Sequence, residues 1–254
     1  MGNSARRIYA GMHTSNKFAV YFEDLNANEL KFLDRKLRKM QFPNYFDEQR
    51  FSPRTLEIAE NILQDKWKEA VEAALTKPSE FESEKSKEMK GIIAENWGKW
   101  KELSENLDLP FPKRKIFEEL GSTGDFRKAF EMLPRKAIGI YCRSAQSLRF
   151  NERLALEIEK QKQKGQKYIE VAGRKLPVVF KYKALKRELE IDEIFPSSTV
   201  LKRKTYFVAK NVKIEPDKKE PSRRGAWIKF GLRKGCYATM LVKFIKAISG
   251  SSGK

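Results

Sequence analysis

The stretch Phe42-Pro43-Asn44-Tyr45-Phe46-Asp47-Glu48-Gln49-Arg50-Phe51 is the most informative part of this chain of 254 residues. Four aromatic rings lie among amide and guanidinium side chains, and they follow neither a helical nor a strand period. Aromatic faces can stack on a base, an amide can bond to a base edge and a guanidinium can bind phosphate. The stretch therefore indicates a pocket for an unstacked nucleotide rather than a plain core segment.

Further segments in the same chain support this interpretation. They are Ser15-Asn16-Lys17-Phe18-Ala19-Val20, Tyr141-Cys142-Arg143-Ser144-Ala145-Gln146-Ser147-Leu148-Arg149-Phe150-Asn151 and Lys234-Gly235-Cys236-Tyr237-Ala238-Thr239. Together with residues 42–51 they resemble the GNRFRI, AYQSYLFN, KGSYAT and PNYFGEQRFG motifs of the TruD family of tRNA pseudouridine synthases. The resemblance covers about residues 15 to 246, with Asp47 and Ser52 where the family has glycine.

The order of expected elements and the resemblance both imply an α+β fold. A pseudouridine-synthase-like sheet domain, mixed or antiparallel and present in part, is expected to be interrupted by a mostly helical inserted domain. Residues 1–53 are expected to form the first part of the catalytic sheet domain, 54–200 the insertion and 201–248 the return to the catalytic domain. Residues 249–254, rich in Ser and Gly, are expected to be a disordered tail.

The periodicity predicts helices over 28–40, 82–105, 113–120, 125–133 and 135–164. An apolar stripe from Leu56 to Ala74 predicts a further helix that begins at Pro53 after Ser52 as N-cap. Alternation predicts strands over 17–23, 167–171, 176–180, 206–214 and 226–230. Residues 191–204 are expected to be irregular, and residues 237–248 to be a helix or a strand.

By resemblance, the activity is isomerisation of a uridine in the D-stem region of tRNA, at position thirteen, without metal or organic cofactor. Asn44 and Phe46 would hold the target base, and the Phe46 ring would be the stacking face. Arg50 would organise the loop or pair with a phosphate or carboxylate. Tyr45 and Phe51 are expected to be core residues beneath the loop.

The family's nucleophile is an Asp in a G-x-KD-x-x-A-x-T segment that precedes the GNRFRI-like strand. No Lys-Asp dipeptide occurs in this sequence, so the expectation is a chain that lacks the nucleophilic segment and is inactive alone. A separate chain could carry the missing segment. Asp47 is the one aspartate inside a motif, and it would either substitute as nucleophile or obstruct the pocket. The alternative function is a non-catalytic RNA-binding or tRNA-binding paralogue or fragment.

The charge of the chain indicates a nucleic-acid partner. Fifty-three Lys and Arg against thirty-four Asp and Glu give a net charge of +19, and a polyanion relieves the self-repulsion. A generally basic surface that serves only solubility is the alternative. The residues expected to contact the tRNA backbone are Arg114, Arg135, Lys202, Arg203, Arg223, Arg224 and Lys234.

Other classes of protein fit the sequence poorly. No apolar run approaches the roughly 20 residues that span a bilayer, and the first thirty residues lack an apolar signal core, so a cytoplasmic protein is expected. Cys142 and Cys236 lie far apart without a CxxC pattern, and His13 is the single histidine. Neither a disulfide framework, a zinc site nor a histidine-based triad is therefore expected.

Because many counterions are released when Lys and Arg neutralise phosphates, tRNA affinity should fall steeply with salt. Neutralising about six phosphates corresponds to a loss of roughly a thousandfold between 50 and 200 mM salt. A fluorescence titration with tRNA measures this loss. An affinity that stays constant over this range would show that the charge does not drive RNA binding.

Overall fold

The computed structural model describes residues 14–23, 25–79, 82–106, 108–161, 166–178, 186–195, 198–217 and 225–249. The chain forms two compact units. Unit 1 consists of Met1–Asp47, Asn151–Leu189 and Lys202–Lys254, and unit 2 consists of Glu48–Phe150 and Glu190–Leu201. The inserted domain over 54–200 stays a prediction; of that range, Asn151–Leu189 belongs to unit 1.

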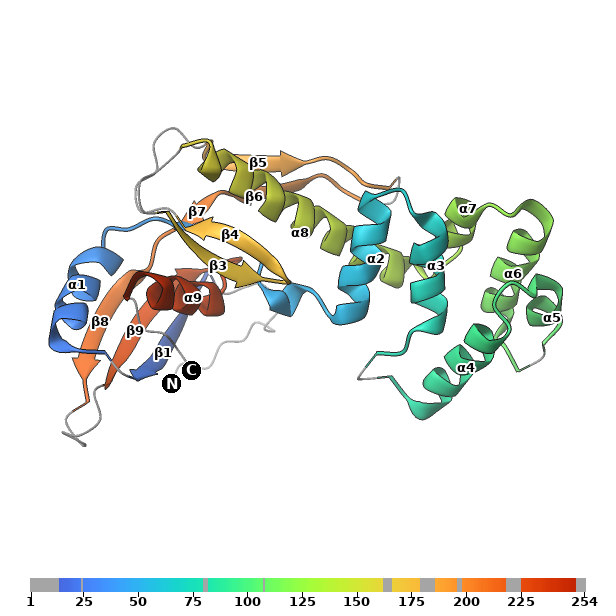
Figure 1. Cartoon of the computed structure of the whole chain (residues 1–254), viewed down its shortest axis with the longest axis horizontal. Coiled ribbons are helices and arrows are strands. Elements are labelled where there is room, and N and C mark those ends of the chain that lie inside the picture. Colours follow the sequence, from blue (N-terminus) through green and yellow to red (C-terminus); the bar gives the residue numbers. More distant parts are fainter. Residues whose placement is uncertain are drawn as a thin grey trace, which may run out of the picture. The chain divides into compact units, whose positions relative to one another are not determined.

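A three-stranded antiparallel sheet forms part of unit 1 (Figure 1). Its strands are β1 (Ser15–Glu23), β9 (Gly225–Arg233) and β8 (Lys210–Pro216), in the order β1-β9-β8. On β9, the alternate side chains from Ala226 to Leu232 are buried, while Trp227 on the other face is exposed. One face of this sheet therefore contributes to the core, as the alternating pattern predicts.

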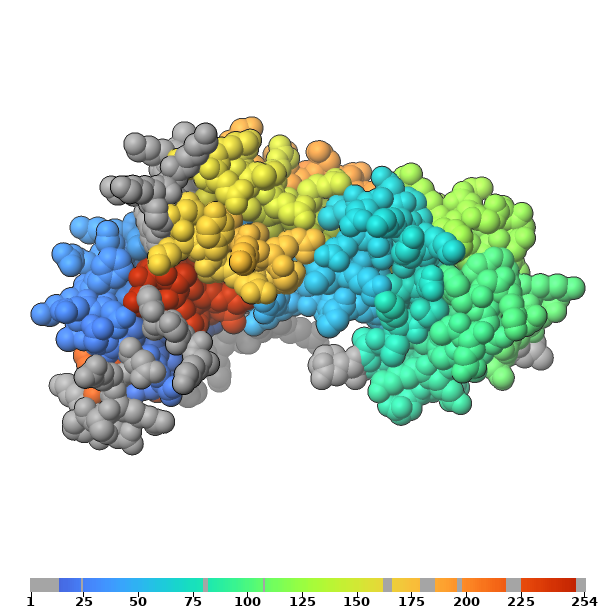
Figure 2. Space-filling view, in the orientation of Figure 1, coloured from blue at the N-terminus to red at the C-terminus, as the bar shows by residue number. Residues whose placement is uncertain are grey.

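Two helices accompany the sheet. Helix α1 (Ala27–Leu37) begins with a capping box in which the side chain of Asn26 accepts from the backbone of Glu29 and the Glu29 carboxylate accepts from Asn26 N. Helix α9 (Ala238–Ser249) resolves the predicted choice at 237–248 in favour of a helix. It contacts α1 and strand β3, and Figure 2 shows it in red against the yellow β3–β4 region.

The core of unit 1 is centred on three phenylalanines. Phe42 belongs to β2 (Phe42–Pro43), which pairs with β7 (Tyr206–Phe207). The Phe42 ring centroid lies 5.6 Å from those of both Phe207 and Phe244. These ring contacts hold Phe42 in place and therefore set the position at which the segment after Pro43 begins.

The remaining strands of the described chain form two pairs. Strands β3 (Lys167–Val171) and β4 (Arg174–Val178) form the predicted hairpin, and Gly173 takes the turn with φ of +72°. Strand β5 (Glu188–Ile191) pairs with β6 (Leu201–Lys204). The expectation that 191–204 is irregular throughout was therefore wrong at its two ends.

Unit 2 is mostly helical. Its helices are α2 (Pro53–Leu63), α3 (Trp67–Thr76), α4 (Glu84–Glu95), α5 (Trp100–Glu105), α6 (Phe111–Thr123), α7 (Phe126–Glu131) and the first part of α8 (Arg135–Glu159), preceded by the short 3-10 turn η1 (Glu48–Arg50). The predicted helix over 82–105 is two helices, with Gly98 at φ +94° between them. The stripe from Leu56 to Ala74 is likewise split, at Asp65 with φ +55°.

The α+β fold class is confirmed.

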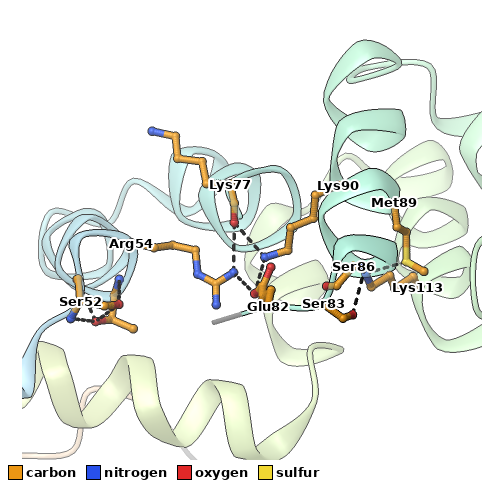
Figure 3. A network of polar contacts seen from close by, with 10 residues as sticks. Ser52, Arg54, Lys77, Glu82, Ser83, Ser86, Met89, Lys90 and Lys113 are labelled. Atoms are coloured by element: carbon orange, nitrogen blue, oxygen red, sulfur yellow. Dashed lines mark hydrogen bonds and ion pairs between the residues drawn. The ribbon is translucent and has the colours of Figure 1, made fainter. Parts of the chain in front are cut away.

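A buried polar network connects α2, the end of α3 and α4 in unit 2 (Figure 3). Glu82 Oε1 accepts from Arg54 Nη1 at 2.6 Å and from Lys90 Nζ at 2.8 Å. Both cations also donate to the carbonyl of Lys77, at 3.0 and 2.8 Å. One carboxylate and one carbonyl thus hold two cations whose side chains are mostly buried.

The network determines the protonation of Glu82. Burial alone would raise the pKa of Glu82, but the hydrogen bonds and charges of Lys90 and Arg54 outweigh burial and lower the pKa to about 2. Burial lowers the pKa of Lys90, against the opposing effect of its hydrogen bond with Glu82. The Glu82 carboxylate is therefore charged at neutral pH and offsets two partly desolvated cations.

We expect Glu82→Gln to lower the free energy of unfolding by about 3 kcal/mol at neutral pH, because it leaves two buried cations without a counter-charge. The folded pKa lies below the ordinary value of 4.5, so this stabilisation is present above about pH 4.5 and is lost as the pH falls toward 2. Denaturant unfolding across this pH range measures the difference. Glu84→Gln is the control, since the Glu84 side chain is exposed beside Lys87 and its loss should cost less than about 1 kcal/mol. Equal costs for the two variants would contradict the role of the network.

Candidate nucleic-acid interface

The segment Asn44–Asp47 follows β2 and is buried along its whole length. Asn44, Phe46 and Asp47 are only 5%, 6% and 2% exposed. Buried polar groups need hydrogen-bond partners. The backbone N–H of Asn44 donates to the carbonyl of Thr205 at 2.9 Å, and Asn44 Nδ2 donates to the carbonyl of Lys204 at 3.1 Å.

Arg203 on β6 binds this segment directly. Its Nε donates to the Asn44 carbonyl at 2.8 Å, and its Nη2 donates to Asn44 Oδ1 at 3.0 Å and to the Tyr45 carbonyl at 3.3 Å. The guanidinium carbon lies 3.9 Å from the centroid of the Phe46 ring, which is a close cation–π contact. Arg203 is predicted to contact the tRNA backbone, and in this structure it lies against the Asn44–Asp47 segment and also lines a pocket.

Asn151 on α8 holds the same segment from another part of the chain. Its Oδ1 accepts from Phe46 N at 2.8 Å, and its Nδ2 donates to the Phe46 carbonyl at 2.9 Å. Asn151 is itself 2% exposed, so both amide atoms are satisfied by Phe46. This contact joins two of the motifs that the sequence pattern singled out, and Asn151 was not among the predicted site residues.

Asp47 forms a buried ion pair. Its Oδ1 lies 3.1 Å from Lys243 Nζ on α9, although the geometry is not that of a hydrogen bond. Lys243 Nζ also donates to the carbonyl of Glu170 at 3.0 Å. The side chain of Asp47 therefore packs inside unit 1 against Lys243, an arrangement that suits a structural carboxylate better than a reacting one.

A basic pocket of about 480 Å³ lies in unit 1 beside Asn44. Its lining residues include seven cations and one carboxylate, Glu188. The cations are Arg187, Lys202, Arg203, Lys204, Lys210, Arg233 and Lys234. The structure thus brings together three of the residues predicted to bind RNA, which are Lys202, Arg203 and Lys234. Such a density of positive charge in a hollow favours a polyanion.

Arg187 and Lys210 of this pocket were missed by the sequence analysis. Neither belongs to a motif that the sequence pattern singled out, and strand pairing brings both to the pocket. Cys236 also lines the pocket, and burial raises the pKa of its thiol against the opposing charges of Arg203, Lys204 and Arg233. The raised pKa keeps this thiol protonated and therefore a weak nucleophile near neutral pH.

The other predicted residues lie elsewhere. Arg50 and Arg114 belong to unit 2, where Arg50 Nε donates to Ser147 Oγ at 3.2 Å and the Arg114 guanidinium lies 5.8 Å from the Phe111 ring centroid. Arg135 is exposed at the start of α8. Arg223 and Arg224 lie outside the residues that the structure describes.

Two further features bear on the chemistry of the described chain. Among its residues, no three His, Cys, Asp or Glu side chains come together as a metal site. No described helix is both long and apolar enough to cross a membrane.

Comparison with known proteins gives a consistent result. The family described as tRNA pseudouridine synthase D (TruD) matches residues 1–170. A probable tRNA pseudouridine synthase D 2 of Methanocaldococcus jannaschii is 24% identical over 278 residues, covering 90% of this chain and 66% of that protein. A probable tRNA pseudouridine synthase D 1 of Methanococcus maripaludis is 28% identical over 160 residues, covering 60% of this chain and 41% of that protein. The chain thus spans less than two thirds of the length of either relative.

A solved structure shares the fold. The putative tRNA pseudouridine synthase D (TruD) from Methanosarcina mazei matches with a TM-score of 0.57 at 19% identity. The match covers 98% of this chain and 72% of that chain. At this identity the match supports the architecture alone.

A double-mutant cycle tests the Asp47–Lys243 pair. Lys243→Met should cost about 3 kcal/mol of unfolding free energy, because it leaves a buried carboxylate unpaired. Asp47→Asn should cost about 1 kcal/mol, since the Lys243 side chain is partly exposed and can reach water. The double variant should cost at least about 1 kcal/mol less than the two single costs together. Lys246→Met, at an exposed position on the same helix, is the control, and strictly additive costs would disprove the coupling.

Proposed function

The chain belongs to the TruD family of tRNA pseudouridine synthases, and we propose that it binds tRNA and forms the base-holding part of a site that isomerises uridine. We propose the uridine at position thirteen, in the D-stem region, as the target. Unit 1 would be the catalytic sheet domain and unit 2 the inserted domain. The observation that carries this proposal is the basic pocket beside Asn44.

The pocket suits a phosphodiester chain. Seven Lys and Arg side chains line it, and a phosphate that enters would relieve their mutual repulsion. Phosphate contacts fix the position of RNA but carry no sequence information. Recognition of the base therefore has to come from residues at the wall of the pocket.

Asn44 is the residue at that wall that can bond to a base edge. Its side-chain oxygen accepts one hydrogen bond from the Arg203 guanidinium, and its side-chain nitrogen donates one to the backbone carbonyl of Lys204. An amide has two donors and two acceptor lone pairs, so one of each stays available for a uracil edge. Phe46 would supply the stacking face for the uracil ring.

Breaking the glycosidic bond needs a positioned carboxylate, which the described pocket does not provide for this chemistry. Asp47 is buried against Lys243, and Glu188 lies among seven cations. We propose that a segment of the G-x-KD-x-x-A-x-T type supplies the nucleophile, and this sequence contains no Lys-Asp dipeptide. A separate chain could provide that segment.

RNA binding without catalysis is the second candidate function. The pairing of Asp47 with Lys243 favours it for this chain by itself, because the pocket and its charge are present without a reacting carboxylate. The two candidates differ in one observable, which is turnover after the missing segment is supplied.

We expect that the chain alone binds tRNA but forms no pseudouridine. Supplying a G-x-KD-x-x-A-x-T segment, fused or as a separate chain, should restore turnover if the pocket is the base-holding half of a catalytic site. Carbodiimide mapping or mass spectrometry of tRNA incubated with each form measures the product.

The outcomes of this assay are distinct. Turnover by the unaided chain would refute the proposed division of the site, and its loss in Asp47→Asn would identify Asp47 as the nucleophile. Binding without turnover in both forms would support the non-catalytic function. Absence of tRNA binding would refute both.

A further inference from the structure

The ring of Phe46 is covered in this structure. It is 6% exposed, the Arg203 guanidinium lies 3.9 Å from its centroid, and the Tyr237 ring meets it edge-on at 6.3 Å. A uracil that stacks on a phenylalanine ring needs the space directly above one face. In the described chain, that space above Phe46 is held by Arg203.

Arg203 contacts the Phe46 ring and also lines the basic pocket. Asn44 and Arg203 are among the described residues that line the pocket, and Phe46 is not. A base that enters beside Asn44 therefore meets the guanidinium before it meets the ring.

We propose that Arg203 is a positioning residue that exchanges partners when RNA binds. In the free protein its guanidinium holds the Asn44–Phe46 segment and covers the Phe46 ring. On binding, the target base takes the place of the guanidinium on Phe46, and Arg203 turns into the pocket to pair with an RNA phosphate. This inference rests on the proposed function.

The surroundings of Arg203 make this exchange physically reasonable. Six other cations line the pocket, so the guanidinium is repelled there until a phosphate enters and is attracted once it has done so. The delocalised, weakly hydrated guanidinium suits a ring face, and it can also bind a phosphate with two parallel hydrogen bonds.

The segment itself does not depend on Arg203 alone. Phe46 keeps both backbone hydrogen bonds to Asn151, and Asn44 keeps its bonds to Thr205 and Lys204. The guanidinium can therefore leave without releasing the Asn44–Phe46 backbone. Arg203 would move while the base-binding residues stay in place.

The side-chain Nε–H resonance of Arg203 reports this exchange by NMR. Replacing Arg203 with Lys identifies the resonance by its disappearance. In the free protein, the Phe46 ring current should displace the resonance from the ordinary arginine position, and Phe46→Leu should remove that displacement. Adding a tRNA transcript with uridine at position thirteen should move the Arg203 resonance of the unaltered protein in the direction in which Phe46→Leu moves it.

The titration separates the possible failures. Backbone amide shifts at Lys202 or Lys234 show that tRNA has bound. If those amides shift while the Arg203 resonance keeps its ring-current displacement, tRNA binding is supported and the proposed exchange of partners by Arg203 is refuted. If no amide shifts, the proposed function fails and the exchange fails with it.

The gain of a phosphate contact is tested by the salt dependence of tRNA affinity. Arg203→Gln removes the charge but can still donate to the Asn44 carbonyl, so it should lower the slope of log affinity against log salt by about 1. Arg203→Lys should keep the slope, since it keeps the charge. Arg35→Ala, at an exposed position on α1, is the matched control and should leave the slope unchanged. An unaltered slope in Arg203→Gln would show that Arg203 does not reach a phosphate.

Discussion

Burial of the Asn44–Asp47 segment is the constraint on which the site in unit 1 depends. A segment with this many polar groups is stable inside a protein only if each group finds a partner. Arg203, Asn151 and Lys243 provide those partners from three different elements. The positions of Asn44 and Phe46 are therefore set by contacts with residues distant in sequence rather than by the local conformation of the loop.

Two of the residues that brace Phe46 come from different parts of the chain. Helix α8, which contains the Tyr141–Asn151 run, supplies the amide that braces Phe46, and strand β6 supplies the arginine that covers it. Both contact the chain at the Asn44–Phe46 segment. The segment thus has hydrogen-bond partners on more than one element and does not depend on Arg203 alone.

The fold was largely predictable because it follows from periodicity. The 3.6-residue and two-residue patterns identified most helices and strands, while the breaks at Asp65 and Gly98 require positive φ values that hydrophobic patterns do not reveal. The motif residue Asn44 lines the basic pocket, and its role in holding a base stays a prediction. Arg187 and Lys210 were not identified, because only the pairing of distant strands brings them to the pocket.

The net charge of +19 has to be divided between internal and external uses. Arg54 and Lys90 neutralise Glu82 within unit 2, and Lys243 neutralises Asp47 within unit 1, so none of the three offers its full charge to RNA. The contacts of Arg203 with the Asn44–Phe46 segment differ in kind, because they are made to neutral carbonyls, an amide and a ring. Its charge is held in place but not cancelled by these contacts. Neutral contacts of this kind can order the segment and can still be exchanged for a phosphate, whereas a contact with a carboxylate would oppose that exchange.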